Sequence, residues 1–263
     1  WGASSNDVYA VGELGTILRN DGSSWSNWQS PTNEFLAGVW GTSAEDIYVT
    51  GASGTILHHD GEQNIGPWWR DMASGTDGWM SAIWGASPKD IYAVAEGGTL
   101  RHYDGVEWTR VQSASDMSDG LHDVWGSSST DVFAVGVNSK ILHFDGFEWS
   151  EMDNGMSGSI SAVWGLSSND VYVAGAGGRI AHYDGANWTR MDSGTDELLA
   201  SLWGTSSTDV YAAGYHGVIL HYNGTEWSEM SSGTYTDFES VWGTSDGAVH
   251  VVGRYGTILQ GRR

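Results

Sequence analysis

Residues 199–230 read LASLWGTSSTDVYAAGYHGVILHYNGTEWSEM, and close variants of this text recur along the whole chain of 263 residues. The most regular element is a Trp-Gly pair. It begins at Trp1, Trp40, Trp84, Trp125, Trp164, Trp203 and Trp242, so successive copies lie 39 to 44 residues apart. A repeat of this length is one supersecondary unit that buries its apolar faces against its neighbours.

Each repeat reads as four short strands. In the quoted copy the first strand is 199–203, and the second is the nearly continuous apolar run at 209–214, which suits a strand covered on both faces. A Gly-x-x-Gly turn leads to the third strand at 217–222. An Asn-Gly pair, Asp-Gly in other copies, is typical of a hairpin and leads to the fourth strand at 227–230. A loop that carries Ser-Gly-Thr in several copies returns to the next repeat.

Four strands in each repeat, with no helical periodicity of useful length, predict an all-β fold: a seven-bladed β-propeller of four-stranded antiparallel blades. We expect a single domain over 1–263, with repeats beginning near residues 1, 40, 84, 125, 164, 203 and 242. Six blades with a displaced terminus are the alternative. The strand count leaves blade one almost without its first strand and blade seven without its fourth. Either two thinned blades close the ring or the segment belongs to a longer array.

Composition excludes several classes of function. Asp and Glu number 33 against 11 Lys and Arg, which gives a formal charge of −22 and argues against nucleic acid and anionic membranes as partners. No apolar run is long enough to span a membrane. Cysteine is absent, which excludes disulfides and thiolate metal sites. The apolar mass lies instead in aromatic residues, 16 Trp and 11 Tyr among them.

The repeat resembles the Trp-rich propeller repeats of bacterial, especially myxobacterial, surface and secreted proteins, and the resemblance covers the whole chain. The hairpin His-Tyr-Asp-Gly-x-x-Trp, as at 182–188, is also similar to the Asp-box of sialidase-like propellers. It departs from that box in having His where Ser or Thr is expected and in having Gly directly after Asp. An Asp-box marks a fold rather than a catalytic site. The resemblance implies a propeller and no particular ligand.

Most periodic residues are expected to be structural. The tryptophans of the Trp-Gly pairs and of the fourth strands should pack between blades. Recurring histidines should form hydrogen bonds across strands within their own blades, because equivalent positions on packed sheets lie about 10 Å apart and are too distant to share a metal ion. They are His58, His102, His143, His182 and His221. The turn aspartates, such as Asp209, are expected to accept hydrogen bonds from nearby backbone.

No catalytic motif is recognisable, so we predict no catalytic residues, no metal ligands and no cofactor. The scattered carboxylates leave weak Ca²⁺ binding as an alternative. Fold analogy leaves a second alternative, a hydrolase or lyase with its site at the mouth of the central channel. Its candidate residues are His122, Asp123 and Glu239.

The positions that vary within the constant repeat are the best candidates for a binding site, because loops on a rigid scaffold commonly carry function. The Gly-x-x-Gly turns keep their glycines in most copies and change the middle pair. In blades six and seven these turns and the loop between them carry Tyr215, His216, Tyr235, Arg254 and Tyr255. Trp68, in the insertion of the second repeat, and Trp79, just before a first strand, break the repeat pattern and complete the predicted ligand-binding set.

Aromatic residues beside an arginine suit a protein anchor or a sugar ring. The leading hypothesis is therefore a non-enzymatic binding or scaffold module that recognises a protein or carbohydrate through one propeller face. A structural spacer within a longer repeat protein is a further alternative. Acidity and the resemblance predict a secreted or cell-surface location in a bacterium. The oligomeric state is left open.

Overall fold

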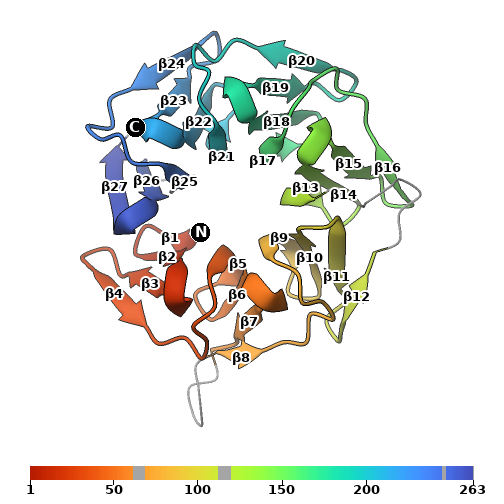
Figure 1. Cartoon of the computed structure of the whole chain (residues 1–263), viewed down its shortest axis with the longest axis vertical. Coiled ribbons are helices and arrows are strands. Elements are labelled where there is room, and N and C mark those ends of the chain that lie inside the picture. The colour runs from red at the N-terminus through yellow and green to blue at the C-terminus, as the bar shows by residue number, and fades with distance from the viewer. Residues whose placement is uncertain (62–68, 112–119, 245–246, 263) are drawn as a thin grey trace. The chain divides into compact units, whose positions relative to one another are not determined.

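The computed structural model describes residues 1–61, 69–111, 120–244 and 247–262. Their strands form six four-stranded sheets and one three-stranded sheet, and every pairing between strands is antiparallel (Figure 1). The helices among these residues are all three-residue 3₁₀ turns. The predicted all-β, seven-bladed β-propeller is confirmed.

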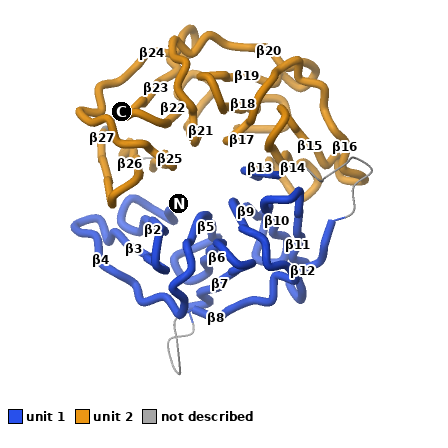
Figure 2. The backbone as a smooth tube through the Cα atoms, in the orientation of Figure 1, with its two compact units in different colours: residues 1–124 blue, residues 125–263 orange. Residues whose placement is uncertain are grey.

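The chain divides into two compact units, Trp1–Val124 and Trp125–Arg263 (Figure 2). Blades 1 to 3 lie in unit 1 and blades 5 to 7 in unit 2. The boundary falls inside the first strand of blade 4. The expected single domain stays a prediction.

In unit 1 the strands of each blade follow one another in chain order. Blade 1 contains β1 (Gly2–Ser4), β2 (Asp7–Val11), β3 (Ile17–Asn20) and β4 (Trp25–Trp28). Blade 2 contains β5 (Leu36–Ser43), β6 (Asp46–Gly51), β7 (Ile56–His59) and β8 (Arg70–Asp71). Blade 3 contains β9 (Met80–Ser87), β10 (Asp90–Ala95), β11 (Thr99–Tyr103) and β12 (Trp108–Arg110). The 3₁₀ turns are η1 (Glu13–Gly15) and η2 (Ala52–Gly54).

The remaining blades keep the same order. Blade 4 contains β13 (Leu121–Ser128), β14 (Asp131–Gly136), β15 (Ile141–Phe144) and β16 (Trp149–Glu151). Blade 5 contains β17 (Ile160–Ser167), β18 (Asp170–Gly175), β19 (Ile180–Tyr183) and β20 (Trp188–Met191). Blade 6 contains β21 (Leu199–Ser206), β22 (Asp209–Gly214), β23 (Ile219–Tyr222) and β24 (Trp227–Met230). Blade 7 contains β25 (Phe238–Gly243), β26 (Ala248–Gly253) and β27 (Thr257–Arg262). The 3₁₀ turns are η3 (Val137–Ser139), η4 (Ala176–Gly178), η5 (Tyr215–Gly217) and η6 (Arg254–Gly256).

The Trp-Gly pair joins neighbouring blades. In unit 2 the indole of Trp164 lies over Gly204 of the next blade, and a Cβ atom added at Gly204 would lie 2.7 Å from Cη2 of that indole. The same contact recurs in unit 1, where the ring of Trp40 lies over Gly85 at 2.6 Å. At Gly41, Gly85, Gly165, Gly204 and Gly243 the glycine follows tryptophan because the ring of the preceding blade occupies the space of a side chain. The predicted packing role of these tryptophans is confirmed.

The fourth-strand tryptophans also pack against their own sheets. Trp108 faces Tyr103 across the β11–β12 pair with ring centroids 5.3 Å apart, and Trp227 faces Tyr222 across the β23–β24 pair at the same centroid distance. Trp69 is buried in the core shared by blades 1 and 2. Such aromatic cross-strand pairs stabilise a sheet beyond the burial of their area.

The recurring histidines pair with aspartates of their own blades, as expected. In blade 6, Nε2 of His221 lies 2.9 Å from Oδ1 of Asp209, and the imidazole stacks on Tyr211 with ring centroids 4.6 Å apart. Equivalent pairs join His58 to Asp46, His102 to Asp90, His143 to Asp131 and His182 to Asp170.

The turn aspartates have side-chain partners besides the backbone expected of them. In blade 6 the hydroxyl of Thr205 donates to Oδ2 of Asp209 at 2.5 Å. In blade 4 the carboxylate of Asp131 also accepts a backbone hydrogen bond from Ser127, as expected. Within the turn of blade 6, Oγ of Ser206 accepts the N–H of Thr208 at 3.3 Å. The aspartate and the histidine meet only in the folded sheet, which brings the third strand beside the start of the second.

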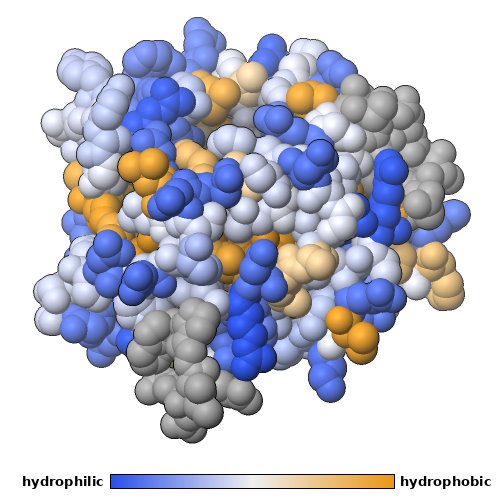
Figure 3. Space-filling view, turned by 60° about the horizontal axis from the view of Figure 1, so that its bottom comes forward, coloured by the Kyte–Doolittle hydropathy of each residue, from blue (hydrophilic) through white to orange (hydrophobic). Residues whose placement is uncertain are grey.

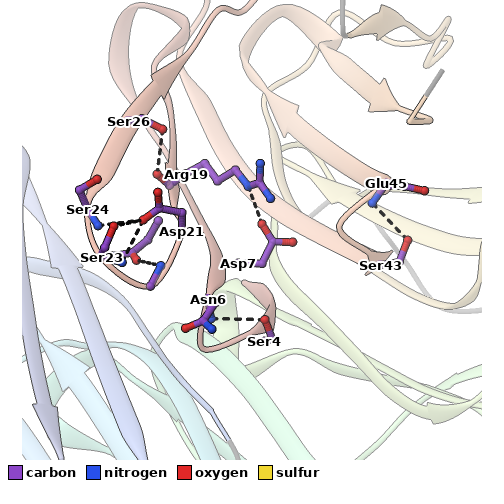
Figure 4. A network of polar contacts seen from close by, with 12 residues as sticks. Ser4, Asn6, Asp7, Arg19, Asp21, Ser23, Ser24, Ser26, Ser43 and Glu45 are labelled. Atoms are coloured by element: carbon purple, nitrogen blue, oxygen red, sulfur yellow. Dashed lines mark hydrogen bonds and ion pairs between the residues drawn. The ribbon is translucent and has the colours of Figure 1, made fainter. Parts of the chain in front are cut away.

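Blade 1 replaces the histidine with Arg19, whose Nε donates to Oδ1 of Asp7 at 2.6 Å (Figure 4). Its first strand, expected to be almost missing, is reduced to the three residues of β1. Blade 7 has Ala248 and Gln260 at the aspartate and histidine positions. Among the described residues its sheet has three strands, which confirms that its fourth strand is missing there.

Candidate binding site on blades 6 and 7

The Gly-x-x-Gly turns fold as the 3₁₀ turns η1 to η6 and as a turn at 96–98 in blade 3. The second of the two residues between the glycines adopts a left-handed backbone conformation, with φ of 53° at His216 and 58° at Tyr255. In blade 6 the closing glycine is required by a close approach. A Cβ atom at Gly217, where φ is +79°, would meet the carbonyl oxygen of Thr234. This contact fixes the turn of blade 6 against the loop that leads to blade 7.

The turns and the returning loops lie side by side, joined by backbone hydrogen bonds. The N–H of Gly178 donates to the carbonyl of Glu197 at 2.8 Å, and the N–H of Arg254 donates to the carbonyl of Asp237 at 3.0 Å. In unit 2 the coiled ribbons of these turns lie toward the viewer in Figure 1. We call the side chains gathered here the blade 6–7 surface. They are Glu197, Tyr215, His216, Tyr235, Asp237, Glu239, Arg254 and Tyr255.

Arg254 is the centre of this surface. Its guanidinium carbon lies 5.0 Å from the ring centroid of Tyr215, and Nη2 donates to the Tyr215 hydroxyl at 3.0 Å. Nε donates to Oε1 of Glu239 at 2.9 Å, and Nη1 lies 3.1 Å from Oδ2 of Asp237. All three guanidinium nitrogens therefore have intramolecular partners. Arg254 organises the surface, and the ligand contact expected of it from the sequence stays a prediction.

Asp237 links the two turns. Its Oδ1 accepts the N–H of His216 at 3.0 Å while its other oxygen and its carbonyl bind Arg254. Nδ1 of His216 lies 2.7 Å from Oε2 of Glu197, on the loop that enters blade 6. The hydrogen bond and charge of Glu197 raise the pKa of the His216 imidazole, and the charge of Asp237 adds to that effect. The hydrogen bond that Arg254 donates to Glu239 likewise raises the pKa of Arg254, which stays charged.

Two tyrosines project from this network into solvent. Tyr235 is 88% exposed and Tyr255 is 95% exposed. Chain connectivity keeps Tyr235 within about 7 Å of Asp237 and Tyr255 next to Arg254, measured between Cα atoms. Tyr255 has a bulky side chain in a left-handed conformation that costs an L-residue about 1–2 kcal/mol. The same conformation recurs at the equivalent position of other blades, as at Leu14, so the feature that distinguishes Tyr255 is its exposed aromatic ring beside Arg254.

The predicted residues fall into three groups. Tyr215, His216, Tyr235, Arg254 and Tyr255 all belong to the blade 6–7 surface. Trp79 lies in unit 1 and is 37% exposed, with its ring 4.8 Å from that of Phe35. Trp68 lies outside the described residues.

Sequence reasoning did not assign Glu197 and Asp237 to the site. The sequence does distinguish Asp237, because a carboxylate replaces the apolar residue that other copies of the loop have there, namely Phe35, Trp79 or Leu198.

Two of the residues considered for a hydrolase or lyase site, Asp123 and Glu239, form hydrogen bonds with neighbouring groups. Oδ1 of Asp123 accepts the N–H of Val124 at 2.8 Å, and Glu239 pairs with Arg254.

Across the described ranges, no group of three or more His, Asp or Glu side chains is placed to hold a metal ion. In the same ranges no helix is long and apolar enough to cross a membrane. Much of the face shown in Figure 3 is hydrophilic, and hydrophobic residues form small patches on it.

No protein-family model matches the chain, and no curated protein matches it in sequence. Solved structures do match. A structure described as YCF48 bound to D1 peptide is 16% identical, with a TM-score of 0.79 over 100% of this chain and 90% of that one. The WD40 β-propeller domain of Doa1 is 12% identical, with a TM-score of 0.83 over 98% and 90% of the two chains. A chain of the mitotic checkpoint complex is 15% identical, with a TM-score of 0.78 over 100% and 85%. These likenesses show the propeller fold.

Proposed function

We propose that the protein is a non-enzymatic binding module that recognises a protein or peptide through the blade 6–7 surface. The observation that carries the proposal is Tyr255, which is 95% exposed and held in left-handed backbone beside a network of fixed charges. Exposed aromatic side chains on rigid supports are typical anchors of protein interfaces. A secreted or cell-surface location, expected from acidity and resemblance, belongs to the same proposal.

The rigidity of the support favours a binding role. Tyr215, Asp237 and Arg254 come from two neighbouring blades and are joined by an ion pair, a hydrogen bond to the phenol and a cation–π contact. A surface that is already ordered loses little conformational entropy when a partner binds. Support also comes from the similar structures, one of which is described as bound to a peptide and another as part of a complex.

Selection from a random dodecamer peptide library tests the proposal. We expect the wild-type protein to enrich specific peptides and the Tyr235→Ala/Tyr255→Ala variant to lose them. The matched control is Leu14→Ala, which removes an exposed side chain at the equivalent left-handed position of blade 1. Equal enrichment by wild type and the double variant would refute this binding surface. Binding confined to a glycan array would replace the protein partner with a carbohydrate.

A further inference from the structure

The blade 6–7 surface combines exposed tyrosine rings with an excess of carboxylates. Three carboxylates, those of Glu197, Asp237 and Glu239, accompany one arginine. The formal charge of the whole chain is −22, so the surrounding field also attracts cations. We propose that the partner segment bound here carries arginine, whose guanidinium stacks on Tyr255 or Tyr235 and pairs with the half-exposed Glu239 and Glu197. This inference rests on the proposed function and adds the chemistry of the partner.

The protein itself contains one example of this mode of binding. Arg254 lies against Tyr215 while its nitrogens pair with Glu239 and Asp237. The local geometry therefore already accommodates a guanidinium between a phenol ring and two carboxylates. Tyr255 follows Arg254 directly in the chain and presents a second ring, which is exposed. Guanidinium groups stack on tyrosine faces and form paired hydrogen bonds with carboxylates, so a second arginine would find the same two kinds of contact.

The carboxylates retain acceptor capacity for a partner. The contact of Glu239 with Arg254 engages Oε1, and the contact of Glu197 with His216 engages Oε2. An ionised carboxylate has two oxygens and about four acceptor sites, so each group has room for a further donor. Both side chains are more than two-fifths exposed and lie within reach of solvent. An anionic partner would instead meet three negative charges and an arginine whose nitrogens are engaged.

Titration of the protein with three acetylated pentapeptides at 150 mM salt tests the inference. The peptides are Gly-Arg-Gly-Arg-Gly and its counterparts with lysine or citrulline in place of arginine. Citrulline keeps the shape of arginine and removes the charge. We expect the arginine peptide to bind more than about tenfold more tightly than the citrulline peptide. The Tyr235→Ala/Tyr255→Ala variant should lose about fivefold to thirtyfold in affinity for the arginine peptide. The lysine peptide should bind less tightly than the arginine peptide, because lysine lacks the planar fork.

The controls separate a site from general attraction to an acidic protein. Leu14→Ala should leave the arginine peptide's affinity unchanged, and so should Glu13→Gln, which removes a carboxylate from the turn of blade 1. Equal losses in these controls and in the tyrosine variant would overturn the inference, as would equal binding of the citrulline peptide. If the dodecamer selection enriches peptides without arginine that still need Tyr235 and Tyr255, the partner chemistry fails and the binding function stands. If no enrichment depends on the tyrosines, the proposed function itself fails.

Discussion

The same loop and turn positions carry different chemistry in the two units. The carbonyl of Phe35 accepts the N–H of Ala52, and the carbonyl of Trp79 accepts that of Glu96. In unit 2, Asp237 makes the equivalent bond to Arg254. The backbone arrangement is thus shared. In unit 1 the side chains at these positions form an apolar contact, Phe35 against Trp79, whereas in unit 2 an aspartate holds an ion pair.

In this repeat, the groups that hold the loops in place are different from the side chains that the loops present to solvent. In both units backbone hydrogen bonds hold the loops against the turns, and the Trp-Gly contacts join neighbouring blades. Side chains that point away from those contacts are free to differ, because their replacement costs the fold little. Tests of the comparison should therefore show equal effects for support residues and unequal effects for the loop side chains.

The largest expected effect concerns the shared support. Gly85→Ala in unit 1 and Gly204→Ala in unit 2 should each destabilise the protein by about 1–3 kcal/mol, because the new methyl group meets the indole of Trp40 or Trp164. Denaturant unfolding measures the loss. Gly12→Ala is the control, since nothing lies within 4 Å of a Cβ atom there. If only one of the two variants lost stability, the Trp-Gly contacts of the two units would not be equivalent.

The next effect distinguishes the two loop chemistries. Asp237→Ala should lower the free energy of unfolding by about 1–2 kcal/mol, because it removes a hydrogen bond to His216 and the ion pair with Arg254. The same variant should lose arginine-peptide binding, measured by calorimetry. Trp79→Ala, at the equivalent position of unit 1, should leave that binding intact. Retained binding in Asp237→Ala, together with loss in Trp79→Ala, would reverse the assignment of the site.

A smaller effect separates backbone strain from binding. Tyr255→Gly and Leu14→Gly should each raise stability by up to about 1 kcal/mol, because glycine adopts positive φ without steric cost while its larger chain entropy offsets part of the gain. Thermal unfolding measures this gain. Only Tyr255→Gly should weaken binding of the arginine peptide. A loss of stability in Tyr255→Gly would show that the tyrosine contributes to the fold.

The smallest effect follows the charge of His216. Its pKa is raised above the ordinary 6.5 by Glu197, so the imidazolium forms as pH falls through that raised value and offsets the carboxylate. Binding of the arginine peptide should then weaken by about threefold, the size of one added charge near 7 Å in water. Affinity measured from pH 8.5 to pH 5.5 checks this, and His216→Gln should remove the dependence. The free energy of unfolding should change with pH in the opposite direction to peptide affinity. The stabilisation from the His216–Glu197 pair is fully present below pH 6.5 and is lost as pH rises through the raised pKa of His216.

Much of the fold could be predicted from sequence because periodic residues make periodic contacts. The Trp-Gly pairs and the apolar second strands recur in seven copies, the glycine turns are complete in most of them, and each copy corresponds to one sheet. The tyrosines and Arg254 could be located because they vary within that constant pattern. The side-chain partners of Asp209 and Arg254 were not predictable, since they lie on another strand or another blade.

Taken alone, the amino-acid order determined which residues form strands, which turns need glycine and which face carries the variable side chains. These properties depend on local sterics and on the alternation of apolar residues. Folding in three dimensions decided that Asp237 ties two turns together, that the nitrogens of Arg254 are engaged within the protein, and that Tyr235 and Tyr255 stay exposed. Such contacts join residues up to 39 positions apart, as in Arg254 and Tyr215. Only the stacking of one blade on the next brings those side chains within hydrogen-bonding distance.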